Sequence, residues 1–144
     1  MFKTIVVAID GSAPSQHALD TASKLAVTFD ADLHLVHSPQ IETTMIAVGY
    51  SVMDVPITPE RIAEAGASVM DAALASAKDA GCTKVNSTIG SGDATDDILD
   101  AAKLNDADLI VMGRRGLGSI ASVLMGSVSQ KVAHGASCSV LTVN

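Results

Sequence analysis

Two glycines and two arginines stand together between residues 113 and 116. Gly113 and Gly116 have no side chains, so the backbone there can approach a ligand closely and take unusual dihedral angles. Arg114 and Arg115 place two cations in a chain whose formal net charge is −7. Glycines that only turn a surface loop are the alternative. We rank it lower, because a second group of small residues follows at the start of a helix.

That second group is Gly126-Ser127, which opens a predicted helix. The first N–H groups of a helix have no acceptor within it, so the amides of Ser127, Val128 and Ser129 are expected to point at whatever lies before the helix. These donors and the helix dipole favour a phosphate, and the dipole contributes about 0.3–1 kcal/mol at an exposed site. The pattern from 113 to 129 therefore predicts a phosphate-binding loop.

Short apolar runs rich in β-branched residues predict the strands that position this loop, and stretches with helical spacing lie between them. The strands are expected over residues 4–9, 32–37, 84–89, 108–112 and 138–143. The helices are expected over 18–29, from Thr58-Pro59 to about 77, from Asp93 to 104 and from 126 to 135. This alternation of strand and helix predicts an α/β fold, a single-domain open parallel sheet with helices on both faces.

In an open parallel sheet, ligands bind beyond the carboxyl ends of the strands. The segments 8–12, 37–39, 89–92 and 112 onward follow predicted strands, so they are expected to meet there. One connection is unusual, because residues 38–57 form an apolar link of about twenty residues, well beyond the common length. One interpretation is structural, an extra short helix or a flap over the sheet end. The other is functional, a mobile lid or a partner-contact segment. The sequence favours neither interpretation.

The composition excludes several classes of partner. An acidic chain with one tyrosine, two phenylalanines and no tryptophan lacks the basic patch and the stacking platforms that nucleic acids require. The same charge is unsuited to an anionic membrane surface, and no apolar run is long enough to span a bilayer. Cys82 and Cys138 are expected to be free thiols in a reducing compartment. We therefore expect a cytoplasmic protein without nucleic-acid or membrane partners.

Other chemical signals are weak. Residues 7–12 superficially resemble the aspartyl-phosphate motif of haloacid-dehalogenase phosphatases, but Ala8 stands where that chemistry needs a nucleophilic carboxylate. His34 and His37 lie three apart on a predicted strand, so they point to opposite faces and cannot share a metal ion. Helix capping and the helix dipole explain the acidic stripe over 93–100. We assign no catalytic residue and no metal ligand.

The spacing Gly113-x-x-Gly116, nine residues and then Gly126-Ser127 resembles the G-2x-G-9x-G-S/T pattern of the universal stress protein family, specifically of its ATP-binding branch. Agreement extends to residues 7–12, 35–37, 106–113 and 124–129. The resemblance covers the whole chain in order and implies one universal stress protein domain over 1–144. It also implies a five-stranded sheet of order 3-2-1-4-5, of the adenine-nucleotide alpha-hydrolase-like type.

The resemblance further implies that ATP binds, accompanied by Mg²⁺, between the ends of the first and fourth strands. The residues that would line the base and ribose pocket are Ala8, Ile9 and Asp10, with Ser38 at the adenine. Those that would flank the ribose and phosphates are Met112, Gly113, Arg115 and Gly116. Those that would carry the triphosphate are Gly126, Ser127, Val128 and Ser129.

Two functions of different classes remain open. A binding module would use ATP as a ligand that stabilises one conformation or assembly, and would act as a nucleotide-dependent stress-response regulator on an unknown protein partner. A slow ATPase or phosphoryl-transfer enzyme would need a residue that positions water or an acceptor. Asp10 is the only obvious carboxylate at the strand ends. Because the family resemblance places Asp10 near the base instead, we favour the binding module.

The predicted last strand, 138–143, suggests an assembly. It is apolar, and the strand order implied by the family places it at the edge of the sheet. Unpaired backbone groups at an edge favour antiparallel pairing with a second copy. We therefore expect a homodimer through the C-terminal strand.

Overall fold

The computed structural model of this chain describes residues 1–41, 45–48, 51–117 and 124–144. Its main sheet contains five parallel strands: β1 (Thr4–Ile9), β2 (Asp32–His37), β5 (Val85–Ile89), β6 (Leu109–Gly113) and β7 (Ser139–Val143). Their spatial order is β5-β2-β1-β6-β7, which is 3-2-1-4-5 when these strands are numbered along the chain. The predicted fold is confirmed, and the predicted strands match to within one residue at each end.

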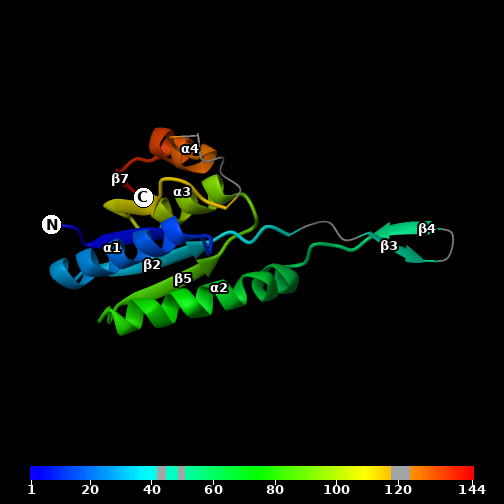
Figure 1. The fold of residues 1–144 in the computed structure, drawn as a ribbon, viewed down its shortest axis with the longest axis horizontal. Helices are drawn as coiled ribbons and strands as arrows, with labels where there is room; N and C mark the ends of the chain where they lie inside the picture. Colours follow the sequence, from blue (N-terminus) through cyan, green and yellow to red (C-terminus); the bar gives the residue numbers. More distant parts are fainter. Residues whose placement is uncertain (42–44, 49–50, 118–123) are drawn as a thin grey trace.

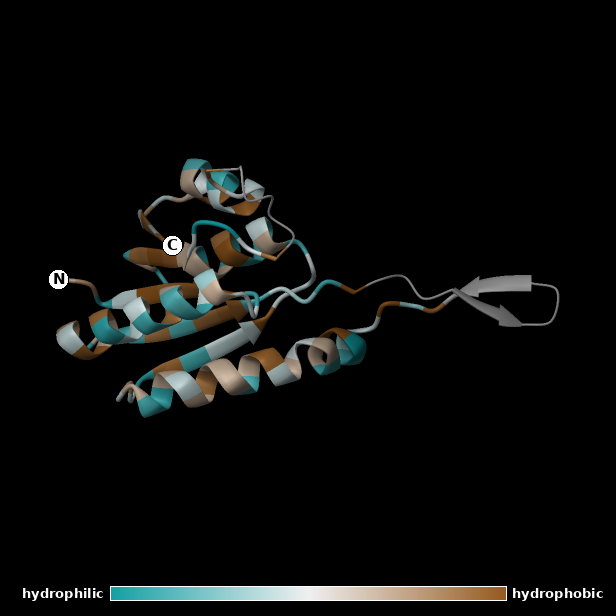
Figure 2. Ribbon diagram, in the orientation of Figure 1, coloured by the Kyte–Doolittle hydropathy of each residue, from teal (hydrophilic) through white to brown (hydrophobic). Residues whose placement is uncertain are grey.

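Helices cover both faces of this sheet (Figure 1). The helices α1 (Ala13–Phe29) and α2 (Pro59–Asp79) pack on one face, and α3 (Ala94–Leu104) and α4 (Ser127–Gly135) pack on the other. Alternate residues of β1 separate the two cores: Ile5 and Val7 join the first, whereas Val6 joins the second. Such two-sided burial explains why the central strands β1 and β6 are apolar almost throughout rather than alternating, unlike the more exposed edge strand β5. In Figure 2 these central strands are largely hydrophobic.

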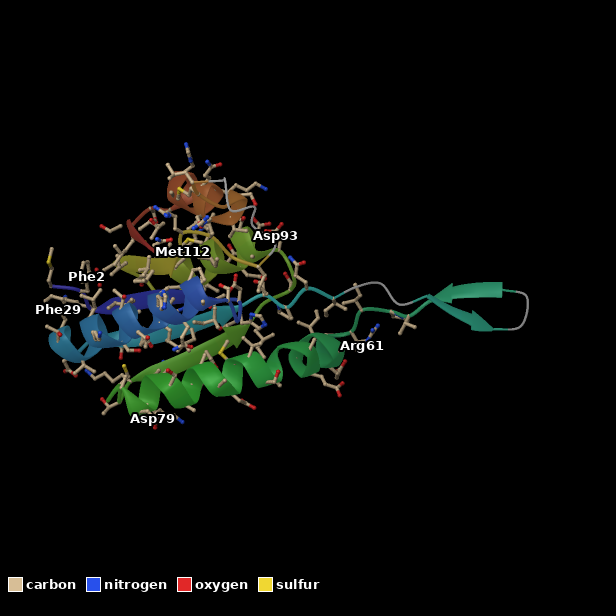
Figure 3. The ribbon with its side chains drawn as sticks, viewed as in Figure 1. Phe2, Phe29, Arg61, Asp79, Asp93 and Met112 are labelled. Atoms are coloured by element: carbon tan, nitrogen blue, oxygen red, sulfur yellow. The ribbon has the colours of Figure 1, made fainter. Side chains whose placement is uncertain are left out.

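Small side chains allow the helices to approach the sheet closely. On α1 the buried positions include Ala18, Ala22 and Ala26, and on α2 they include Ala73 and Ala77. These residues recur at helical spacing, so each helix buries one narrow face. The few aromatic rings lie elsewhere. Phe2 and Phe29 meet edge to face, 5.6 Å between ring centroids, at the end of the molecule opposite the hairpin described below (Figure 3).

The helix starts differ in how they are capped. Ser12 accepts a hydrogen bond from Ser15 N, Thr58 from Arg61 N, and Asp93 from Asp96 N, so the predicted caps of α2 and α3 are confirmed. Gly126, which precedes α4, has no side chain to cap with. Since a side-chain cap satisfies one of the free amides of a helix start, α4 has more unsatisfied donors than the other helices when only the described residues are considered.

The long link between β2 and α2 contains an antiparallel hairpin of β3 (Met45–Val48) and β4 (Ser51–Asp54). Figure 1 shows this hairpin extended away from the layered body, so over its described part the expected short helix or flap over the sheet end is wrong. The guanidinium of Arg61 donates to the carbonyls of Val55 and Pro56, where the link rejoins α2 (Figure 3). A role as a lid or partner-contact segment stays a prediction, and residues 42–44 and 49–50 lie outside the described part.

Among the described residues, no helix is long and apolar enough to cross a bilayer. Both cysteines are free, with Cys82 buried and Cys138 half-buried.

Candidate functional site

A cavity of about 540 Å³ opens at the carboxyl ends of β1, β2 and β6. This size is typical of small-molecule sites, and the position is the one at which open parallel sheets bind ligands. All the residues predicted for the site line it: Ala8, Ile9, Asp10, Ser38, Met112, Gly113, Arg115, Gly116, Gly126, Ser127, Val128 and Ser129. The fold thus brings them together, while their part in binding stays a prediction.

One end of the cavity is formed by the start of α4. The amides of Ser127, Val128 and Ser129 donate to no acceptor in the described part of the chain. Gly126 adopts φ −69° and ψ 159°, which any residue can adopt, so its missing side chain matters for space rather than for backbone conformation. Small residues and free donors at a helix start are suited to an anion.

The loop after β6 is held against this helix start by hydrogen bonds. The buried hydroxyl of Ser129 lies 2.9 Å from the carbonyl oxygen of Gly113 and 3.1 Å from that of Arg114, and donates to both. The amide of Gly126 donates to the Arg114 carbonyl at 2.8 Å. The Ser129 side chain therefore positions the loop, and only its main-chain amide remains available to donate to a ligand.

The glycines of this loop are required for space rather than for unusual dihedral angles. A Cβ on Gly113 would lie 2.9 Å from Pro14 Cβ, and one on Gly116 would collide with the Asp10 carboxylate. Neither glycine has a positive φ, so the expectation of unusual backbone geometry is wrong at these two positions. Gly11 does require it, with φ 82°.

Asp10 connects the end of β1 to the same loop. Its Oδ1 accepts from Ser12 N at 2.8 Å, and its Oδ2 accepts from Leu117 N at 3.2 Å. Both carboxylate oxygens therefore hold backbone in place. Of the two arginines of the loop, only Arg115 lines the cavity, whereas the Nε of Arg114 is buried without a hydrogen-bond partner.

The other end of the cavity has apolar walls that the motif did not indicate. Ala65 and Val69 of α2 form one wall, and Ala94 and Ile98 of α3 form another. Each pair has a spacing of four, which predicts a shared helix face but not what that face contacts. The buried ring of His37 also lines the cavity, and its Nδ1 is 2.7 Å from the carbonyl oxygen of Ile9. The Nδ1 must carry a proton there, because a carbonyl oxygen only accepts.

Asp97 joins three chain segments at this apolar end. Its Oδ2 accepts from Ser38 Oγ at 2.6 Å and from Gly92 N at 3.2 Å, and its Oδ1 accepts from the amide and hydroxyl of Ser91 at 3.1 and 3.0 Å. Partial burial acts to raise the pKa of Asp97, but these hydrogen bonds outweigh it and lower the pKa below its usual value. The sequence predicts helix capping and dipole complementarity for the acidic stripe; Asp93 is a cap, whereas Asp97 also joins Ser38 to the segment 91–92.

Titratable groups gather into no metal-ligand cluster in the described residues. His34 is buried and does not line the cavity; its Nε2 is 2.8 Å from Thr88 Oγ1, and its Nδ1 has no partner in the described part of the chain. Burial lowers the pKa of His34.

Comparison with known proteins agrees with this architecture. The pattern of the universal stress protein family matches residues 1–144. A universal stress protein of Thermus aquaticus is 36% identical over 143 residues, covering 99% of each chain, and YxiE of Bacillus subtilis is 30% identical over 151 aligned residues with the same coverage. A solved universal stress protein in complex with cAMP is 28% identical, with a TM-score of 0.76 over 99% of this chain and 97% of its own. This chain belongs to the universal stress protein family.

Proposed function

We propose that this protein binds ATP, accompanied by Mg²⁺, and acts as a nucleotide-dependent regulator of the stress response. The observation that carries the proposal is the start of α4, where the amides of Ser127, Val128 and Ser129 line the cavity without a described acceptor. Hydrogen bonds to a charged group are worth about 1.5–3 kcal/mol each, so such donors favour a polyphosphate even in a chain of net charge −7.

The strand order supports one orientation of the nucleotide. The phosphates would lie at α4, on the β6 side of β1, and the base would lie on the β2 side. The apolar walls at Val69 and Ile98 fit the flat faces of a purine. A similar protein, 28% identical, is known in complex with cAMP, and this likeness supports an adenine nucleotide.

The magnesium ion would be held chiefly by the phosphates. Mg²⁺ is commonly bound through substrate phosphates and one or two carboxylates rather than by an all-protein cage. Asp10 is a carboxylate that lines the cavity. It would orient the ion's water ligands while still accepting from Ser12 N and Leu117 N.

We favour a ligand role for ATP over hydrolysis. A general base must have a lone pair directed at the attacking water. In this proposal the oxygens of Asp10 hold the loop through Ser12 N and Leu117 N and orient the water ligands of the magnesium ion, rather than activating a water at the terminal phosphate. Bound ATP would then act by stabilising one state, by about 4 kcal/mol at a thousandfold excess over the dissociation constant.

The test is to add Mg-ATP and measure both the melting shift and the release of phosphate. We expect a clear shift with negligible turnover. Gly126→Val should abolish the shift without unfolding the protein, because φ −69° and ψ 159° suit valine. Ala133→Val is the control, since it places the same valine side chain at an exposed position of α4.

Two outcomes would contradict this proposal. If the melting shift with Mg-ATP persists in Gly126→Val, the start of α4 does not bind the phosphates. Multiple turnovers that vanish in Asp10→Ala would favour the slow ATPase instead.

We also propose that residues 1–144 act as one domain that forms a homodimer through β7, in the cytoplasm. The strand β7 pairs only with β6, so its other edge is unpaired in the described residues, and Leu141 there is 37% exposed. The expected mass in light scattering is that of a dimer, and Leu141→Lys should lower it, because charges on edge strands oppose pairing. A monomeric wild-type mass would refute the dimer. The free cysteines support a reducing compartment, which cell fractionation would test.

A further inference from the structure

The cavity end on the β2 side contains a polar group whose hydrogen-bonding direction is set by its neighbours. Ser38 follows β2, is half-buried and lines the cavity among the apolar walls. Its hydroxyl has one proton and two lone pairs. The proton is directed to Asp97 Oδ2, at 2.6 Å. Towards anything in the cavity, Ser38 Oγ can therefore act only as an acceptor.

Asp97 cannot reverse this arrangement. Its other hydrogen bonds come from the amides of Ser91 and Gly92 and from the Ser91 hydroxyl. An ionised carboxylate only accepts, and the hydrogen bonds that lower the pKa of Asp97 keep it ionised at neutral pH. The orientation of the Ser38 hydroxyl is thus determined by a residue 59 positions away in sequence.

We propose that Ser38 is a specificity-determining residue, positioned by Asp97, which selects 6-amino purines over 6-oxo purines. The inference rests on the proposed nucleotide site and on a base lying at its β2 side. Adenine has an amino group at C6, which donates to Ser38 Oγ. Hypoxanthine and guanine have a carbonyl at C6. The lone pairs of that oxygen would face those of Ser38 Oγ, so both acceptors would remain without a donor.

The size of the effect follows from the cost of an unsatisfied buried polar group. That cost corresponds to at least about a fivefold loss of affinity. Inosine nucleotides are the cleanest probe, because hypoxanthine lacks the additional 2-amino group of guanine. The measured quantity is the ratio of the dissociation constants of Mg-ITP and Mg-ATP, determined by calorimetry at neutral pH.

Wild-type protein is expected to prefer ATP over ITP by about fivefold or more. Ser38→Ala removes the acceptor, so the ratio should fall below about twofold. Asp97→Asn should also lower or invert the ratio, because its amide group can donate to Ser38 Oγ and free the hydroxyl proton for a 6-oxo group. Asp96→Asn is the matched control. It makes the same charge change in the same helix turn at an exposed position, and should leave the ratio unchanged.

The ratio of dissociation constants separates a loss of specificity from a general loss of structure, since a loosened fold would weaken the binding of both nucleotides by a similar factor. If Asp97→Asn fails to fold, Ser38→Ala alone decides. Equal binding of ATP and ITP by wild type, or a ratio that persists in Ser38→Ala, overturns this inference and leaves the proposed function intact. Binding of neither nucleotide by wild type refutes both.

Discussion

The two ends of the cavity use different parts of the chain. At the α4 end, the groups that face a ligand are chiefly main-chain amides, with Arg115 also lining the cavity, and the side chains of Ser129 and Asp10 hold the backbone in place. At the β2 end the available groups are side chains, namely the apolar walls and the hydroxyl of Ser38, which Asp97 orients. A backbone amide is present in every residue, whereas a hydroxyl or a carboxylate can be changed by one substitution.

This difference assigns separate tasks to the two ends. Amides at a helix start attract any phosphate and carry no information about the base. Side chains at the other end distinguish bases and contribute little to charge recognition. The first end should therefore set how tightly a nucleotide binds, and the second should set which nucleotide binds.

The largest expected effect comes from removing the phosphates of the ligand. Adenosine should bind at least about tenfold more weakly than ATP, because each lost hydrogen bond to a charged group is worth about 1.5–3 kcal/mol. The preference for adenosine over inosine should nevertheless equal the preference for ATP over ITP to within about twofold, as expected for independent sites. Calorimetry on the four ligands measures both quantities. A preference that disappears with the phosphates would show that the two ends are not independent.

A smaller effect is expected from Ser129→Ala. This change leaves the carbonyls of Gly113 and Arg114 without the hydroxyl they accept from, and should lower the free energy of unfolding by about 1–3 kcal/mol. Binding of ATP and ITP should weaken by the same factor, since the loop moves and the base end does not. Chemical denaturation and calorimetry provide the two measurements. Ser137→Ala, at an exposed serine between α4 and β7, is the control and should be neutral.

The smallest effect concerns pH. Burial lowers the pKa of His34 on β2, so the unfolded chain binds a proton more readily than the folded one. The free energy of unfolding should therefore fall as pH drops below about 6.5. His34→Gln should flatten this dependence in denaturation curves between pH 7 and pH 5. The ratio of ITP to ATP dissociation constants should stay constant over this range. If this ratio changes with pH in the wild type but not in His34→Gln, protonation of His34 affects the base end of the cavity.

The sequence predicts the layers of this fold well, and the reason is physical. The strand over 4–9 is an almost continuous apolar run because both of its faces are largely buried. The strand over 32–37 is buried on both faces after its first residue, although it contains two histidines. The hairpin of β3 and β4 was not predicted, because its strands are short and Gly49-Tyr50 is not one of the dipeptides typical of a tight hairpin. The length and apolar character of the link indicated a short helix or flap, or else a lid or partner-contact segment, and did not distinguish between them.

The two cavity ends also differ in how far sequence can predict them. The α4 end is local, since glycine spacing and a helix start lie within one segment. The β2 end depends on contacts distant in sequence. Asp97 resembles any acid in a first helical turn, and only the folded chain brings it to Ser38. Val69 and Ile98 belong to helices whose periodicity shows that they share a face with neighbours, but not that this face meets a cavity.

The edge strand and the loop at the α4 end are joined by one short hydrogen bond. Arg114 N donates to the carbonyl oxygen of Val143, the last residue of β7, at 2.6 Å. A ligand that tightens the loop would therefore also restrain the strand through which two copies are proposed to pair. Linkage then demands reciprocity: if nucleotide strengthens association by some factor, association must strengthen nucleotide binding by that same factor. Affinity for ATP would in that case depend on protein concentration.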